Sequence, residues 1–125
     1  MVIVHADVNK MALLMSESDI AFTAFGITLF ELAYMGVPSV VIANYREDKE
    51  DMAAYDKLGI GIPLGFHEEI DGNNIRNAVE SFLHKRELLN EMSKTGKTLV
   101  DGNGVERIVN IIENIGVGDV CRSRQ

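Results

Sequence analysis

The sequence predicts an α/β domain in which a parallel sheet carries helices on both faces. Short apolar segments alternate along the chain with segments of helical periodicity, and this alternation is typical of parallel sheets. The most informative stretch, residues 19–44, has the order strand, tight loop, helix, strand. About a dozen residues connect its two strands, which is the length of a helical crossover between parallel neighbours.

Each element of this central stretch has its own local signal. Ile20–Ala24 is short and apolar, as a buried strand should be, and Gly26 marks the turn that follows it. Apolar residues at helical spacing come next, and Gly36 with Pro38 ends that helix. Val40–Ala43 is then the second buried strand.

The flanking segments extend the same pattern. Two more short strands are expected, at Val2–His5 and at Ile60–Leu64. A change in the phase of the apolar residues predicts that a long helical region after Asp71 is broken near Lys85. Helices are expected at residues 8–17, at 52–58, over the broken region from 71 or 73 onward, and at 105–112.

Composition limits the classes of function. The chain has 125 residues, a length that fits one domain, here expected at 1–116 with a flexible tail at 117–125. A net charge of −7 argues against nucleic acid or an anionic membrane as partner. We find no apolar run long enough for a membrane span and no signal peptide. The single Cys121 cannot form an internal disulfide, so we expect a cytoplasmic protein.

The loop and helix start at Gly26, Ile27 and Thr28 predict a phosphate site. In a parallel unit the helix N-terminus lies at the carboxyl edge of the sheet, where its free N–H groups and dipole attract anions. Glu31 lies one turn further, where its carboxylate can reach the two hydroxyls of a ribose. The alternative is a solvated first-turn acid that interacts only with the helix dipole. No Lys or Arg stands three or four residues from Glu31, so an ion pair within the helix is excluded.

Other signals carry less weight. Gly59-Ile-Gly61 has the spacing of a dinucleotide loop, but a strand follows it where a helix is required. The acids of residues 47–51 have no His or Cys partner, so we expect a solvated loop and no metal. His5, at the end of the first expected strand, is the one histidine well placed for a ligand. We assign no catalytic residue and no cofactor.

Taken together, three segments resemble a known group of enzymes. Residues 19–44, the segment Ala12-Leu-Leu-Met-Ser-Glu-Ser and the segment Asp101-Gly-Asn-Gly-Val-Glu-Arg-Ile resemble the C-terminal, Rossmann-like domain of GT-B nucleotide-sugar enzymes. The looser likeness is to the N-acetylglucosaminyltransferase of peptidoglycan synthesis. The closer one is to the UDP-sugar hydrolase of pseudaminic acid synthesis and the spore-coat polysaccharide proteins. The likeness runs from about Val2 to Ile115.

The resemblance implies a role for particular residues. Glu31 matches the acid that holds the ribose hydroxyls of UDP. The residues matched to the other parts of a UDP-sugar are Gly26, Ile27 and Thr28 beside the diphosphate, Val8 at the uracil edge, and Asn44 and Tyr45 facing the sugar. The transferase has glutamines where this chain has Tyr45-Arg-Glu-Asp, so the identity of the sugar stays open.

A further departure concerns the extent of the chain. Enzymes of this group have two domains, and this chain lacks the first domain and the glycine-rich loop that opens the second. The hydrolase carries its catalytic histidine in that first domain. The resemblance therefore implies the UDP-sugar-binding part of a glycosyltransferase or nucleotide-sugar hydrolase of surface polysaccharide or nonulosonic acid biosynthesis, inactive by itself. It also implies that Val2–His5 lacks its usual neighbours, so we expect a homodimer through that exposed edge.

Two other readings of the sequence stay open. One is a nucleotide-binding or interaction module with no chemistry of its own. The other is a flavodoxin-like or receiver-like signalling domain. The receiver reading needs an aspartate at a strand end and a lysine after a later strand; Asp7 is the candidate aspartate, and the lysine is missing.

Overall fold

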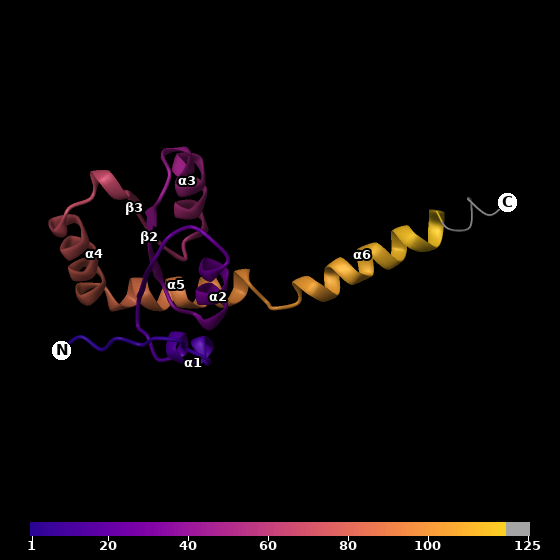
Figure 1. Cartoon of the computed structure of the whole chain (residues 1–125), viewed down its shortest axis with the longest axis horizontal. Coiled ribbons are helices and arrows are strands. Elements are labelled where there is room, and N and C mark those ends of the chain that lie inside the picture. Colours follow the sequence, from indigo (N-terminus) through magenta and orange to yellow (C-terminus); the bar gives the residue numbers. More distant parts are fainter. Residues whose placement is uncertain (120–125) are drawn as a thin grey trace.

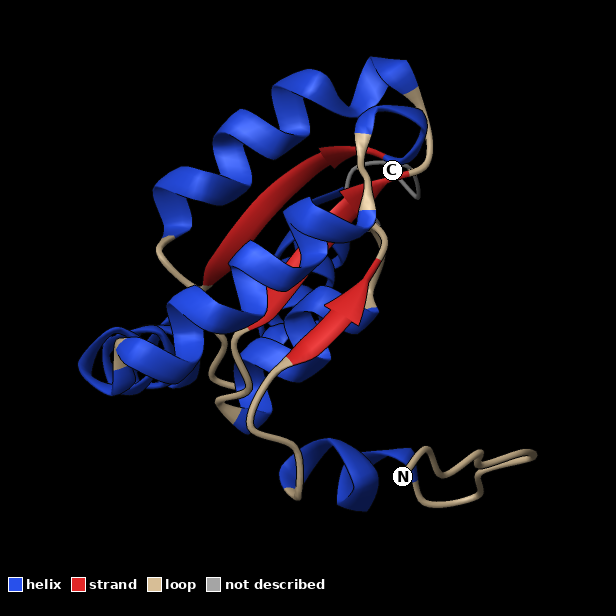
Figure 2. Cartoon of the chain, turned by 90° about the vertical axis from the view of Figure 1, so that its left-hand side faces the viewer, coloured by secondary structure: helices blue, strands red, loops and turns tan. Residues whose placement is uncertain are grey.

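The structure is a computed structural model that describes residues 1–119. A three-stranded parallel sheet, in the order β1–β2–β3, forms its centre. The strands are β1 (Ala21–Thr23), β2 (Ser39–Ala43) and β3 (Gly61–Phe66). They run in one direction, with helices on both sides (Figure 2). The predicted α/β class with a parallel, Rossmann-like sheet is therefore confirmed.

The helices follow the predicted order. Their bounds are α1 (Met11–Ser16), α2 (Thr28–Met35), α3 (Lys49–Leu58), α4 (Gly72–His84), α5 (Arg86–Leu99) and α6 (Gly104–Asp119), with single 3-10 turns η1 (Arg46–Asp48) and η2 (His67–Glu69). The predicted break is confirmed, since Lys85 separates α4 from α5 with a non-helical backbone. Gly36 and Gly59 end α2 and α3 in the left-handed conformation, as their positions predicted.

The prediction of a strand at Val2–His5 is wrong. These residues form no regular structure, and Val2 is 90% exposed. A strand needs a neighbour for its backbone hydrogen bonds and a covering element for its apolar side chains. The described chain supplies neither here. The homodimer was expected through an edge formed by Val2–His5, and no strand forms there; the edges of the observed sheet are β1 and β3.

The last helix, α6, runs past residue 116, where the domain is expected to end. Helix α6 continues to Asp119, three residues past the predicted end of the domain at 116. It leads away from the sheet and its covering helices (Figure 1). Residues 120–125, which make up most of the expected flexible tail, lie outside the described residues.

Strand β2 lies between two apolar clusters. Val40 and Val41 are fully buried, and as successive strand residues they point to opposite faces of the sheet. One face packs on α2 and α3 through Leu29, Ala33 and Tyr55. The other face packs on α4 and α5 through Ala78, Phe82 and Met92. Both predicted layers of helices are therefore present.

Helix α5 also contacts α2 at very short range. A Cβ built on Gly96 would lie 2.8 Å from the carbonyl oxygen of Ala33, so only glycine lets the two backbones approach this closely. Helix α5 thus connects the two layers. The same helix leads into the connection from which α6 departs.

A bulge changes the pairing of β2 with β3. Val41 pairs with Pro63, but the next residue, Ile42, pairs with Gly65, so Leu64 is an extra residue on β3. Gly65 has φ of +136°, a backbone conformation that residues other than glycine rarely adopt. Pro63 has no N–H to donate, which suits the edge position of β3.

A buried hydrogen-bond pair joins the start of β2 to α3. The hydroxyl of Tyr55 donates to the carbonyl oxygen of Ser39 at 3.2 Å, and its oxygen lies 2.7 Å from Ser39 Oγ. Both residues are buried. Burial raises the pKa of the Tyr55 hydroxyl, and the hydrogen bond with Ser39 opposes that shift in part.

We predict that Tyr55→Phe lowers the free energy of unfolding by about 1–3 kcal/mol, because it leaves the buried hydroxyl of Ser39 without its partner. Urea unfolding followed by circular dichroism measures the change. Tyr34→Phe is the matched control, since Tyr34 is half exposed, and it should cost almost nothing. Equal losses for the two variants would contradict a structural role for this pair.

The raised pKa of Tyr55 adds a pH test of the same pair. Above pH 10 the unfolded chain loses the tyrosine proton before the folded chain does, so the unfolded state gains in relative stability. The contribution of the Tyr55 hydroxyl to the free energy of unfolding is complete below pH 10. It is lost as the pH rises through the higher pKa that Tyr55 has in the folded chain. Tyr55→Phe should show a smaller alkaline loss than the wild-type chain.

Candidate functional site

The three strand ends define the candidate site. Because β1, β2 and β3 are parallel, the loops that follow them lie at one edge of the sheet. The loop after β1 leads into α2, the segment Asn44–Tyr45 leads into η1, and β3 leads directly into η2. Open α/β sheets bind their ligands at this edge.

The beginning of α2 is open to solvent. Thr28 is the first helical residue, as predicted, but no side chain caps the helix by a hydrogen bond. Gly26 and Ile27 are both exposed. The N–H groups of Leu29 and Phe30 already donate to the carbonyl oxygens of Gly26 and Ile27, so the N–H groups before Leu29 are the ones left to bind an anion.

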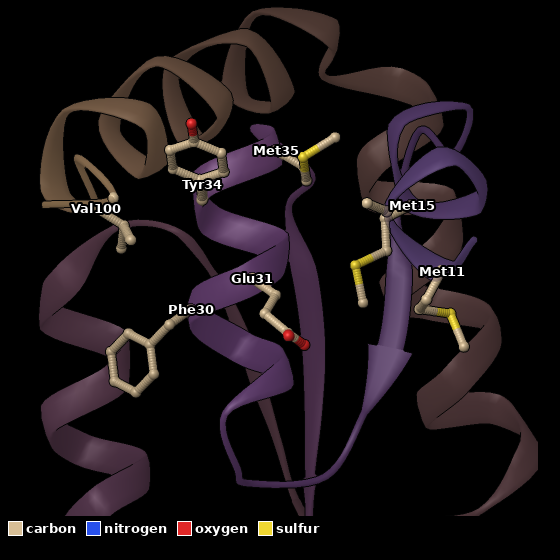
Figure 3. Close-up of a pocket in the computed structure, with 9 residues that line it drawn as sticks. Met11, Met15, Phe30, Glu31, Tyr34, Met35 and Val100 are labelled. Atoms are coloured by element: carbon tan, nitrogen blue, oxygen red, sulfur yellow. The ribbon is translucent and has the colours of Figure 1, made fainter. Parts of the chain in front are cut away.

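Glu31 lines a cavity of about 490 Å³ between α1 and α2. It is the one acidic residue among the cavity walls, which otherwise come from Met11, Ala12, Met15, Phe30, Tyr34, Met35, Val100 and Gly102. Its carboxylate points into the gap between α2 and the methionines of α1 (Figure 3). Within residues 1–119, Glu31 takes part in no ion pair.

The chemistry of this cavity suits a ligand with two different parts. The thioethers of Met11 and Met15 form an adaptable apolar wall, which can pack against a flat ring. An unpaired carboxylate accepts hydrogen bonds from hydroxyl groups. An apolar ring joined to a hydroxylated ring therefore fits the walls better than a small anion does.

A second cavity, of about 390 Å³, lies at the carboxyl ends of β2 and β3. Tyr45, Lys49 and Phe66 are among its walls. Arg46 also lines this cavity. Its guanidinium lies 2.9 Å from Glu68 Oε2, 3.1 Å from Glu69 Oε1 and 4.5 Å from the centre of the Phe66 ring. These contacts join η1 to η2.

Sequence reasoning missed the role of Arg46. In the sequence, Arg46 was noted only because the segment Tyr45-Arg-Glu-Asp differs from the glutamines of the transferase. Its partners are more than twenty residues away, and no local spacing indicates such a pairing. The available signal was a basic residue within three positions of the end of one strand and two acidic residues within three positions of the end of the next.

The predicted site residues do not gather around one cavity. Glu31 lines the first cavity and Tyr45 the second. Val8 is half-buried ahead of α1, and Asn44 is exposed at the end of β2. Neither of these two borders either cavity. Their roles toward a nucleotide-sugar therefore stay predictions.

Two further sequence candidates lie away from the sheet. His5 is exposed in the irregular N-terminal segment, and no group of three or more possible ligands for a metal occurs within the part of the chain that the structure describes. Asp7, at φ of 50°, follows that same segment. It is therefore not at a strand end, as the receiver reading requires.

Comparison with known proteins adds an independent finding. No family model matches the chain, and no solved structure matches it significantly. The spore coat polysaccharide biosynthesis protein SpsG of Bacillus subtilis is 28% identical over 107 residues, which cover 86% of this chain and 32% of that protein. The UDP-N-acetylglucosamine–N-acetylmuramyl-(pentapeptide) pyrophosphoryl-undecaprenol N-acetylglucosamine transferase of Acetivibrio thermocellus is 29% identical over 112 residues, covering 84% of this chain and 30% of that protein.

The chain is related to both proteins. The resemblance read from the residues, to spore-coat polysaccharide proteins and to the peptidoglycan transferase, is thereby confirmed. The chain spans about a third of the length of these relatives. Among the described residues, no helix is both long and apolar enough to cross a membrane.

We predict that Arg46→Lys loosens the junction of η1 and η2, because lysine keeps the charge but loses the forked hydrogen bonds and the planar contact with Phe66. Exposed ion pairs contribute little, so the free energy of unfolding should fall by less than about 1 kcal/mol. Hydrogen exchange of residues 66–69 should become faster.

Lys57→Arg, on the exposed surface of α3, is the control for this exchange experiment. It should leave exchange at 66–69 as it is in the wild-type chain. Unchanged exchange in Arg46→Lys would show that the contacts of Arg46 do not hold the two turns together.

Proposed function

We propose that the chain is the UDP-sugar-binding part of a glycosyltransferase or nucleotide-sugar hydrolase that acts in surface polysaccharide biosynthesis. The observation that carries the proposal is Glu31, an unpaired carboxylate in an otherwise apolar cavity, one turn into the helix that follows β1. One relative is named for spore coat polysaccharide biosynthesis, and the other for transfer of N-acetylglucosamine with a UDP-sugar in its name.

In this proposal Glu31 holds the ribose. Its carboxylate accepts hydrogen bonds from both vicinal hydroxyls, and hydrogen bonds to a charged group are about twice as strong as neutral ones. The position also agrees with the anion site next to it, because the N-terminus of α2 is one helical turn away. A ribose at Glu31 thus leaves its phosphates near Gly26, Ile27 and Thr28.

The base and the sugar occupy opposite ends of the same ligand. The base packs against Met11 and Met15, with the backbone of Val8 at its polar edge. The sugar extends toward Asn44 and Tyr45, which follow β2 at the same edge of the sheet. Tyr45 and the Arg46–Phe66 pair give that end an aromatic and charged surface.

No residue of this chain is given a catalytic role. Transfer and hydrolysis of a nucleotide-sugar both need an acid or base placed at the reacting bond. In this proposal Glu31 holds the ribose, and Glu69 at the second cavity is paired with Arg46, so neither is assigned to the reaction. The relatives are about three times as long, so the proposal places the reacting group in a part of the enzyme that this chain does not contain. The chain itself contributes the nucleotide-binding surface.

We predict weak binding of UDP to the isolated chain. The cavity at Glu31 is open, and the uncapped start of α2 is the only phosphate contact in the proposal. Isothermal titration should give a dissociation constant in the millimolar range, about −4 kcal/mol. Micromolar binding would mean that the chain makes contacts with UDP that the proposal does not include. The absence of binding at UDP concentrations well above the millimolar range would count against a nucleotide site.

We predict that Glu31→Gln abolishes measurable UDP binding with almost no change in melting temperature. Glutamine keeps the shape and helix propensity but loses the charge-assisted hydrogen bonds, each worth about 1.5–3 kcal/mol. Saturation-transfer NMR detects binding this weak. The 2′,3′-dideoxy analogue of UDP should bind equally to both proteins, because it has no hydroxyls for Glu31.

Glu50→Gln is the matched control, an exposed first-turn acid on α3 with the same loss of charge. It should bind UDP as the wild-type chain does. Equal weakening of UDP and of its dideoxy analogue by Glu31→Gln would place Glu31 away from the ribose. A large drop in melting temperature would favour a structural role instead.

A further inference from the structure

Helix α1 is attached to the domain through one buried side chain. Met15, at 9% exposure, is the one residue of α1 that is buried within the described chain. It packs with Leu32 of α2 and with Val37, and Met35 lies half-buried beside them. Helix α1 has only six residues, and no side chain caps its start by a hydrogen bond. A helix this short is marginal without tertiary contacts, so the docking of α1 depends on Met15.

The same methionine is part of the wall of the Glu31 cavity. Met11, Met15 and Met35 all line this cavity, so three of the six methionines of the chain meet there. Met11 and Met15 lie across a gap from Glu31 (Figure 3). Met11 is 48% exposed, so its sulfur is open to reagents in the solvent. Release of α1 would remove one wall of the cavity.

Peroxides convert methionine to its sulfoxide, and dedicated reductases reverse the change. A lone pair of the thioether sulfur attacks one oxygen of hydrogen peroxide, the O–O bond breaks and an S–O bond forms. A proton passes from the attacked oxygen to the departing one, which leaves as water. The sulfur thereby loses two electrons, and the peroxide gains them. The product carries a polar oxygen where the thioether had an apolar surface.

The surroundings of Met15 do not suit a sulfoxide. The neighbouring side chains, Leu32, Val37 and Met35, have no hydrogen-bond donor. The backbone N–H of Val37 already donates to the carbonyl oxygen of Leu32 at 2.9 Å. A buried polar oxygen without a donor is unfavourable, so oxidation of Met15 favours the state in which α1 is undocked and the oxygen meets water.

Met92 provides an internal comparison for access to the sulfur. It is also 9% exposed, but it belongs to α5, a helix of 14 residues, and packs with Val40 and Phe82 against the other face of the sheet. Exposure of Met92 requires the core to open, whereas exposure of Met15 requires only the release of α1. Weakly held segments open more often than the core does, so peroxide should reach Met15 first.

We propose that Met15, together with the exposed Met11, is a reversible oxidation site for peroxides, and that the sulfoxide of Met15 releases α1 and opens the Glu31 cavity. Release of α1 stands on the packing around Met15 alone. Its effect on a ligand rests on the proposed nucleotide function, in which the base packs against Met11 and Met15. Oxidation then weakens nucleotide binding, and reduction restores it.

Site-resolved oxidation of the full chain tests the access to Met15. Every protein carries Cys121→Ser, so that no thiol consumes the oxidant. Limiting hydrogen peroxide is added, and peptide mass spectrometry follows each methionine. Met15 should form its sulfoxide about tenfold faster than Met92, because α1 opens more often than the core. Equal rates for these two methionines would overturn the proposal.

Hydrogen exchange tests the release of α1. The backbone N–H groups of Leu13, Leu14 and Glu17 are hydrogen-bonded in the docked helix, and they should exchange faster after oxidation. Treatment with methionine sulfoxide reductases should restore slow exchange. Exchange in β2 should stay slow throughout, which shows that the sheet is intact.

Met15→Leu separates the sulfoxide of Met15 from the other effects of peroxide. Leucine keeps an apolar side chain of similar volume and has no sulfur, so exchange in α1 should stay slow in this variant after peroxide. Met92→Leu is the matched control and should respond as the wild-type chain does. Unchanged exchange in the oxidised wild-type chain, or equal acceleration in Met15→Leu, would refute release through Met15.

Saturation-transfer NMR with UDP tests the effect on the ligand, each protein being compared with its own untreated form. The oxidised wild-type chain should lose most of its signal, whereas the triple variant Met11→Leu, Met15→Leu, Met35→Leu should keep its own. A wild-type signal that survives oxidation would refute the control of binding by Met15. The absence of a UDP signal before oxidation would refute the nucleotide proposal instead, and the exchange of α1 still decides this one.

Discussion

Burial of β2 on both faces is the constraint on which the structure depends. Val40 and Val41 point to opposite sides and are each covered by a pair of helices, so neither layer can shift without exposing a fully buried valine. Backbone hydrogen bonds to β1 and β3 hold the two long edges of β2. The hydrogen bonds between Ser39 and Tyr55 then hold α3 at the start of the strand. Because β2 is held in this way, the position of the loop that follows its carboxyl end is also fixed.

The two cavities follow from that arrangement. Glu31 lies on α2, the crossover from β1 to β2, and Tyr45 and Arg46 lie just past the end of β2. The first cavity is shaped by packing of α2 on α1, through Met15 and Leu32, and the second by the Arg46 contacts that join η1 to η2. The two cavities therefore have different walls: the first is apolar with one carboxylate, and the second is charged and aromatic.

The sequence was sufficient for the elements whose local pattern and tertiary surroundings agree. The elements of residues 19–44 were predicted closely, because Gly26, Gly36 and Pro38 mark where they begin and end. Burial was predicted correctly for β2, but β1 is only half-buried and its Phe22 is 40% exposed, because β1 is an edge strand of the sheet. Val2–His5 has the same local pattern, but the described chain offers it no neighbour, and composition cannot reveal a missing neighbour. Periodicity correctly predicted a helix at residues 105–112, which lies within α6, yet periodicity cannot tell whether an apolar face is covered.

The candidate site shows the same division. Glu31 was identified because its position one turn into a crossover helix is a local property. The methionines beside it and the glutamates around Arg46 come from other parts of the chain, and only folding brings them together. The relation to SpsG and the transferase was visible in the order of short motifs, although no single motif was decisive.

The bulge in β3 determines which side of the sheet Phe66 faces. Side chains alternate along a strand, so one extra residue reverses every position beyond it. Ile62 and Leu64 pack with the α4 and α5 cluster, and without the bulge Phe66 would follow them there. Because Phe66 instead pairs with Ala43, its ring reaches the side of Met52 and Arg46. A change of one residue in the length of β3 could therefore remove the aromatic wall of the second cavity while the buried core stayed intact, which would let the two evolve independently.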